Sequence, residues 1–159
     1  MALQVRCSFL ISLALVIVSQ AACLQVPDGP GKRFTSDTEG VVVDSTTGLE
    51  WTANNGAVDL PWPESSAYCA ELELGVESDW RLPTIEELEA IHDESVRQPC
   101  GDRECGLDPA VNIDSPYVWS SSAGAGPSRF YRDFALGTSL APFIKPILVR
   151  RVLCVRLPG

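Results

Sequence analysis

The hydrophobic positions of the chain separate an apolar leader from a longer segment of mixed polarity. Residues 9–18 form a nearly continuous apolar run that follows the lone positive charge of Arg6 and precedes Ala21 and Ala22. This three-part layout is typical of a secretory signal peptide. The run is shorter than the roughly 20 residues that a membrane-spanning helix needs. We therefore expect residues 1–22 to be a signal peptide and the chain to be exported.

Short runs rich in β-branched and aromatic residues predict strands on both sides of the chain's middle. Val41–Val43 and Leu49–Trp51 flank a turn in which Asp44 can bond the turn backbone and Gly48 supplies a positive φ, which predicts a β-hairpin. Three further strands are predicted toward the C-terminus, the last of which carries valines among arginines. They cover residues 117–121, 129–135 and 147–157.

Two helices are predicted between these groups of strands. Pro61–Pro63 opens the first, because proline is tolerated in a first turn, and the helical spacing points Cys69 toward the core. Thr84 and Glu87 form a capping box that begins the second helix. The stripe of this helix that we expect to be buried comprises Ile85, Leu88 and Ile91. Strands, two helices and then strands indicate an α+β fold with small antiparallel sheets.

The remaining segments set the domain limits. Residues 23–33 are rich in Pro and Gly and lack periodicity, so we expect a tether there and a single domain over residues 34–159. Residues 97–116 show no repeating pattern and are expected to form a loop stapled by a local disulfide between Cys100 and Cys105. A length of 159 residues with 45% hydrophobic and 21% charged residues fits one globular domain.

The charge distribution narrows the choice of partners. A formal net charge of −9 repels polyanions, so we expect no nucleic-acid binding. Acidic residues dominate residues 37–114, whereas residues 129–156 hold six basic residues against Asp133 alone. We expect these charges to pair within the fold rather than to form a basic patch for an acidic ligand.

Cysteine placement bears on the compartment. Cys23 follows two small residues, as the acylated cysteine of a bacterial lipoprotein does, although Gln20 replaces the usual leucine-like residue. We expect a lipid anchor at Cys23, with ordinary cleavage after Ala21 or Ala22 as the alternative. If Cys7 leaves with the leader, an even set remains that suits two disulfides in an oxidising compartment, with a zinc site as the rival interpretation. This set is Cys69, Cys100, Cys105 and Cys154.

Several strings in order resemble the Lcl C-terminal domain family of bacterial secreted proteins, and Trp80-Arg-Leu-Pro-Thr84 is the most specific of them. The resemblance implies a relative of C-type-lectin-like folds, in which a cysteine of the first helix bonds one of the last strand, and so pairs Cys69 with Cys154. The other strings are Asp44-x-x-Thr-Gly-Leu-x-Trp51, Trp62 with Tyr68-Cys69 and Leu72, Trp119-Ser-Ser-Ser122 and Cys154-Val-Arg156.

Departures from that family limit what can be carried over. Leu153 stands where many relatives have an arginine, so no role of that arginine applies here. The Glu-Pro-Asn and Trp-Asn-Asp strings of calcium-dependent sugar-binding lectins do not occur, and the corresponding residues 123–128 are uncharged. Acidic residues of the stapled loop are suitable oxygen ligands for calcium, but their spacing fits no 12-residue calcium loop, so we expect no cofactor and no metal, with a bound calcium ion as the alternative. They are Asp102, Glu104, Asp108 and Asp114.

No catalytic pattern emerges, and we expect a binding protein rather than an enzyme. The cysteines are explained as structural bridges, and His92 falls at a helix end, where a capping or surface role is expected. Trp51 and Trp80 belong to the family's structural strings and are assigned to the core. A candidate ligand face, called the aromatic–arginine face below, comprises Trp119, Arg129, Tyr131 and Arg132.

These features predict an exported, lipid-anchored ligand-binding or adhesion domain of the bacterial envelope. Its expected partner is an envelope polysaccharide or protein, bound without calcium, and the lipid provides its contact with the membrane. The expected location is the outer membrane as a lipoprotein, or the periplasm or extracellular space. The alternative is a structural envelope lipoprotein with no small ligand.

Overall fold

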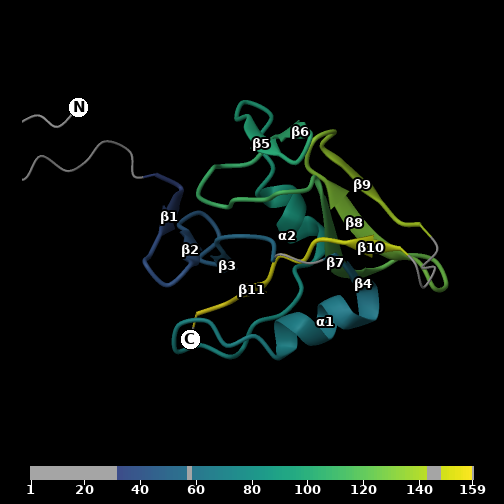
Figure 1. The fold of residues 1–159 in the computed structure, drawn as a ribbon, viewed down its shortest axis with the longest axis horizontal. Coiled ribbons are helices and arrows are strands. Elements are labelled where there is room, and N and C mark those ends of the chain that lie inside the picture. Colours follow the sequence, from purple (N-terminus) through teal and green to yellow (C-terminus); the bar gives the residue numbers. More distant parts are fainter. Residues whose placement is uncertain (1–31, 57–58, 143–147, 159) are drawn as a thin grey trace, which may run out of the picture. The chain divides into compact units, whose positions relative to one another are not determined.

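The computed structural model describes residues 32–56, 59–142 and 148–158, which form one compact unit (Figure 1). The predicted signal peptide at residues 1–22, the predicted acylation of Cys23 and residues 23–31 of the predicted tether lie outside these residues. No helix within the described part of the chain is long and apolar enough to cross a membrane.

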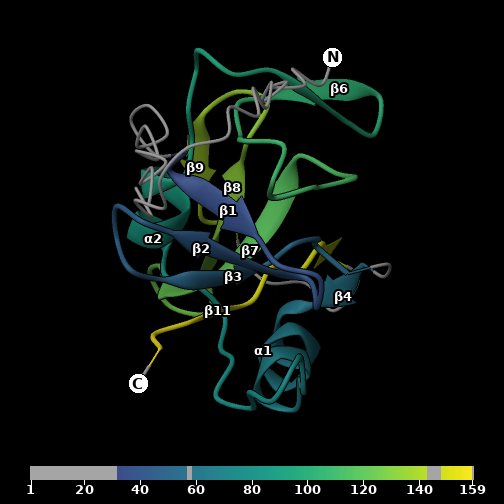
Figure 2. The ribbon, with the colours of Figure 1, turned by 90° about the vertical axis from the view of Figure 1, so that its left-hand side faces the viewer.

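The largest sheet has four antiparallel strands in the order β1-β2-β3-β11, which lie side by side in Figure 2. Their bounds are Phe34–Ser36 for β1, Val41–Asp44 for β2, Glu50–Thr52 for β3 and Val155–Arg156 for β11. The predicted hairpin is confirmed. Asp44 accepts hydrogen bonds from the Thr46 N–H and the Thr47 hydroxyl, and Gly48 has a φ of 72°.

A second sheet runs β7-β8-β9, and two strand pairs complete the sheets. The predicted strands at 117–121 and 129–135 are confirmed as β7 and β8, whereas β4, β9 and the β5–β6 hairpin inside the predicted loop were not predicted. The two strand pairs are β4 with β10 and β5 with β6. The bounds are Tyr117–Ala123 for β7, Arg129–Asp133 for β8, Thr138–Leu140 for β9, Leu60–Pro61 for β4, Val149–Arg150 for β10, Gln98–Cys100 for β5 and Arg103–Cys105 for β6.

The prediction of one strand over residues 147–157 is wrong. The segment forms two short strands in different sheets, β10 and β11, because the residues between them change partners. Arg151 exchanges backbone hydrogen bonds with β7, and the Val152 N–H donates to the Asn55 carbonyl. The Cys154 N–H donates to the Thr52 hydroxyl of β3. The chain thus crosses from one sheet to the other.

Both predicted helices are present. Helix α1, Trp62–Ala70, begins after Pro61 and buries Cys69. Helix α2, Ile85–Ala90, begins at the predicted capping box, in which Thr84 Oγ1 accepts from the Glu87 N–H at 3.2 Å and Glu87 Oε2 accepts from the Thr84 N–H at 2.8 Å. The small antiparallel sheets and two helices confirm the α+β class.

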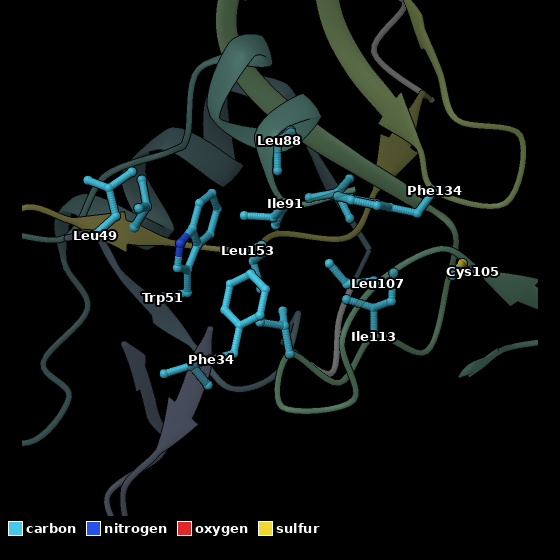
Figure 3. Close-up of a cluster of buried hydrophobic side chains, with 14 of the residues drawn as sticks. Phe34, Leu49, Trp51, Leu88, Ile91, Cys105, Leu107, Ile113, Phe134 and Leu153 are labelled. Atoms are coloured by element: carbon cyan, nitrogen blue, oxygen red, sulfur yellow. The ribbon is translucent and has the colours of Figure 1, made fainter. Parts of the chain in front are cut away.

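Two hydrophobic clusters hold these layers together. The first lies among the four-stranded sheet, α2 and the β7–β8 strands (Figure 3) and contains the predicted stripe of α2 together with Trp51, Phe134 and Leu153. The second lies between α1 and the other side of β7 and includes Trp80, Trp119 and Tyr131. Strand β7 is therefore covered on both faces, with Val118 in the first cluster and Trp119 in the second.

Two disulfides cross-link this architecture, one between distant segments and one within a hairpin. Cys69 of α1 is bonded to Cys154, which directly precedes β11, across a sequence separation of 85. Cys100 is bonded to Cys105 within the β5–β6 hairpin, at a separation of 5. Both predicted pairings are confirmed, and the four sulfurs are thereby unavailable as zinc ligands.

Candidate functional site

The structure does not expose the aromatic–arginine face that we predicted from sequence. Trp119 is 0% exposed, Tyr131 is 8% exposed and Arg132 is 7% exposed. The indole N–H of Trp119 donates to the Leu60 carbonyl at 2.9 Å, and its ring meets Tyr131 edge to face. This prediction is corrected because α1, β4 and β10 cover the side of the sheet on which these rings lie.

Arg150 of β10 is the cation that closes this aromatic layer. Its guanidinium carbon lies 4.7 Å from the Tyr131 ring centroid, 5.0 Å from that of Tyr117 and 5.9 Å from that of Trp119. Such cation–π contacts are strongest when desolvated. The three rings are thus occupied by a side chain of the protein itself and serve packing.

The two arginines of the predicted face have separate environments. Arg132 donates to the Ser139 hydroxyl at 3.1 Å and lies 3.7 Å from the Glu89 carboxylate, and burial lowers its pKa. Arg129 is half-buried and stacks on the Trp62 ring of α1 at 4.4 Å. Of the four residues of the predicted face, Arg129 alone is partly exposed.

The acidic residues of the stapled loop do not converge on one point. Asp114 pairs with Arg151, and Asp108 accepts a hydrogen bond from the Ala110 N–H. Within the described ranges, no three His, Cys, Asp or Glu side chains come together as a metal ion would require. The four-residue calcium ligand set considered from sequence is therefore not assembled.

His92 follows α2 at the position where a helix end was predicted. It is half-buried and lies against Phe134, with ring centroids 6.2 Å apart. Burial lowers its pKa, and the nearby charge of Arg132 lowers it further. The neutral ring is therefore favoured in the folded protein, and its contacts are those of a packing residue.

A polar pocket that the sequence analysis missed lies where the end of β3 meets the segment before β7. It has a volume of about 290 Å³, and we call it the asparagine pocket; it is lined by Asn54, Asn55, Gly56, Asn112 and Asp114. The backbone holds its two sides together, because the Asn112 N–H donates to the Ala53 carbonyl at 2.7 Å. All three asparagines of the chain line this pocket.

Asn55 is the one buried residue among those that line the asparagine pocket. Asn55 is 2% exposed, and its Oδ1 accepts a hydrogen bond from the Asp114 N–H at 3.3 Å. Its Nδ2 is buried without a hydrogen-bond partner in the described part of the protein. A buried amide donor without a partner costs free energy, so a ligand that brings an acceptor oxygen to Nδ2 would gain a hydrogen bond that the described residues do not supply.

The carboxylate of Asp114 at the pocket is paired with Arg151. Both carboxylate oxygens of Asp114 contact Arg151, Oδ1 at 2.8 Å from Nε and Oδ2 at 2.9 Å from Nη2. Asp59 lies 3.6 Å from the same guanidinium. The pocket therefore presents neutral amide groups next to the ion pair between Asp114 and Arg151.

A smaller cavity shares Asn54 with the asparagine pocket. Its volume is about 140 Å³, and we call it the α1 cavity; its lining includes Glu39, Tyr68, Leu72, Leu74 and Val152. It combines apolar walls with one carboxylate.

The sequence indicates the asparagine pocket only weakly. Asn54-Asn55-Gly56 are adjacent polar residues, but Asn112 and Asp114 come from a distant segment, and no local pattern predicts that the two segments meet.

The architecture defines a small, disulfide-stapled α+β domain with a polar pocket. The family model of the Lcl C-terminal domain matches residues 40–156, and the chain belongs to this family. Membership indicates a secreted bacterial domain. No curated protein and no solved structure matches the chain.

Proposed function

We propose that this chain is an exported binding domain of the bacterial envelope that recognises a polysaccharide without calcium. The observation that carries the proposal is the convergence of all three asparagines on one pocket. Side-chain amides present both donors and acceptors, which is the chemistry that sugar hydroxyl groups require. Family membership and the two disulfides support export.

Calcium independence follows from how the pocket's carboxylate is used. Calcium takes six to eight oxygen ligands, and carboxylates are its main protein ligands. The pocket is lined by one carboxylate, Asp114, and both of its oxygens already contact Arg151. A calcium ion here would have to displace the guanidinium.

A binding role rather than catalysis is also part of the proposal. A cysteine nucleophile must be a free thiolate, and the four cysteines of the described domain are disulfide-bonded. His92, the single histidine of the chain, packs against Phe134. We expect no enzymatic turnover.

The direct test is a glycan array probed with the exported, disulfide-oxidised protein, once with calcium and once with a chelator. The proposal predicts binding that the chelator leaves unchanged. Binding that disappears with the chelator would contradict calcium independence. Silence in both conditions, from protein with an intact near-ultraviolet circular dichroism spectrum, would overturn polysaccharide binding and favour the structural lipoprotein.

The membrane contact is proposed to be a lipid on Cys23. Changing Cys23→Ser removes the acylation site, so the variant is expected to move from the membrane fraction to the soluble fraction after cell fractionation. A matched Ser19→Ala variant keeps the cysteine and should remain membrane-bound. A Cys23→Ser protein that stays with the membrane would show that another segment anchors it.

A further inference from the structure

We infer that the asparagine pocket takes a neutral, hydroxyl-rich saccharide unit and discriminates against sulfated and carboxylated sugars. This inference rests on the proposed function and adds the class of ligand and the residues that select it. It depends on the unpartnered amide of Asn55 and on two exposed amides at the rim of the pocket. It also depends on a group of one arginine and two carboxylates that together carry one excess negative charge.

The amide orientation of Asn55 fixes what the pocket demands of a ligand. Asn55 Oδ1 must face the Asp114 N–H, because the reversed amide would place a donor against a donor. Nδ2 is therefore the unpartnered group, and it needs an acceptor oxygen. A sugar hydroxyl or ring oxygen supplies such an acceptor without adding charge.

The rim of the pocket can address further hydroxyl groups. Asn54 and Asn112 are both exposed, and their backbones form a parallel bridge that sets the two side chains on adjacent segments. Asn54 Oδ1 accepts from the Gly56 N–H at 3.4 Å. No hydrogen bond to the Asn112 side chain is present in the described residues, so its amide is available to a ligand.

Electrostatics select against anionic ligands. One guanidinium, Arg151, faces two carboxylates, Asp114 and Asp59, which leaves the group with one excess negative charge. Arg151 Nη2 donates to Asp114 Oδ2, and Nε lies 2.8 Å from Asp114 Oδ1, so a sulfate or carboxylate would compete with a formed ion pair. The adjoining α1 cavity adds the carboxylate of Glu39. A net charge of −9 on the whole chain acts in the same direction.

The test compares one glucose polymer in three forms: neutral dextran, carboxymethyl dextran and dextran sulfate. Any neutral glycan that binds on the array is compared in the same way with its own carboxylated and sulfated derivatives. Isothermal titration on the oxidised exported protein is expected to give at least tenfold weaker binding for the charged forms than for the neutral parent. Because screening lengths shorten with salt, this difference should shrink at high ionic strength. Asp59→Asn should shrink it as well.

Two variants place the binding in the asparagine pocket. Asn112→Ala and Asn54→Ala each remove an exposed amide and should weaken neutral-sugar binding about tenfold, as expected for the loss of one ligand hydrogen bond. Thr46→Ala, an exposed truncation in the β2–β3 turn, is the matched control and should bind like the parent protein.

The outcomes separate this inference from the proposed function. Tighter binding of the sulfated or carboxylated form would overturn the inference while leaving polysaccharide binding in place. Neutral-sugar binding that survives both asparagine variants would place the site elsewhere and likewise overturn it. If no glycan of any charge binds, the proposed function itself fails.

Discussion

Three arginines near the C-terminus hold the final strands by different contacts. Arg150 packs among three aromatic rings, and Arg151 pairs with Asp59 and Asp114. Arg156 of β11 is 7% exposed by its side chain and meets carboxylates from three places: Glu50, Glu77 and Asp79. The sequence predicted that the basic end would pair with the acidic body, and these contacts confirm it.

Removal of the Arg150 guanidinium is expected to destabilise the domain. Arg150→Met keeps an apolar stem but loses the three cation–π contacts, and we expect the free energy of unfolding to fall by about 1–2 kcal/mol. Arg150→Lys should lose less, because an ammonium still faces the rings. Urea denaturation measures both. Arg97→Met, at an exposed position, is the control and should stay within about 0.5 kcal/mol of the parent.

That account of Arg150 would be contradicted if Arg150→Met and Arg97→Met unfolded at the same urea concentration. A loss in Arg150→Lys equal to that in Arg150→Met would attribute the effect to guanidinium shape rather than to charge.

Acid is expected to destabilise the domain through carboxylates whose pKa values lie below their usual range. Burial raises the pKa of Asp44, but hydrogen bonds from Arg33, Thr46 and Thr47 outweigh it and lower the pKa overall. The hydrogen bond from Arg81 lowers the pKa of Glu87. In the unfolded chain these groups hold their protons at higher pH.

The sign of the pH effect follows from this difference. The stabilisation is present above the unfolded pKa values near 4 and is lost as the pH falls through the lower, folded values. Thermal melting between pH 7 and pH 3 should therefore show a midpoint that falls most steeply below about pH 4. Asp44→Asn should flatten this fall; an unchanged slope would contradict the role given to Asp44.

At the scale of elements, locally encoded features were predictable and long-range pairings were not. The β2–β3 hairpin and the α2 capping box are both closed by hydrogen bonds between residues at most a few positions apart. Strand β4 has two residues and exists because it pairs with β10, about 90 positions later along the sequence. No local pattern in Leu60–Pro61 indicates that partner.

The same reasoning explains the strand that was predicted over residues 147–157. Its polarity suits one long strand, but the pairing of β11 with β3 and the bond from Cys154 N–H to Thr52 fix the end of the segment on the four-stranded sheet. The disulfide ties Cys154 to Cys69 of α1 as well. Its beginning, β10, pairs with β4 instead. Two anchors in different sheets divide the segment.

The two disulfides should differ in their contribution to stability. In the chain-entropy account, closing the loop between Cys69 and Cys154 stabilises by about 4–5 kcal/mol, whereas the short loop between Cys100 and Cys105 gives about 2 kcal/mol. The paired alanine variants, Cys69→Ala with Cys154→Ala and Cys100→Ala with Cys105→Ala, can be compared by chemical denaturation. Equal destabilisation of the two would contradict the dominance of the long bridge.

At the scale of the whole molecule, the sequence identified the family and the fold class but not the site. Trp119 was expected on an exposed face with Tyr131, Arg129 and Arg132 because their strands were expected to be neighbours, yet β7 lies between two hydrophobic clusters and exposes neither face at that position. The asparagine pocket arises instead where two distant segments meet through the Asn54–Asn112 bridge. Such a meeting is a property of the assembled domain.

The most direct test of the account is a heteronuclear NMR titration of protein labelled with ¹⁵N at asparagine only. The chain has three asparagines, at positions 54, 55 and 112, so every side-chain amide signal reports on the pocket. Addition of a neutral glycan that binds on the array, in the presence of chelator, should shift all three side-chain signals, with that of Asn55 moving as its Nδ2 gains an acceptor. Saturating glycan that leaves these signals in place would contradict ligand binding at the asparagine pocket.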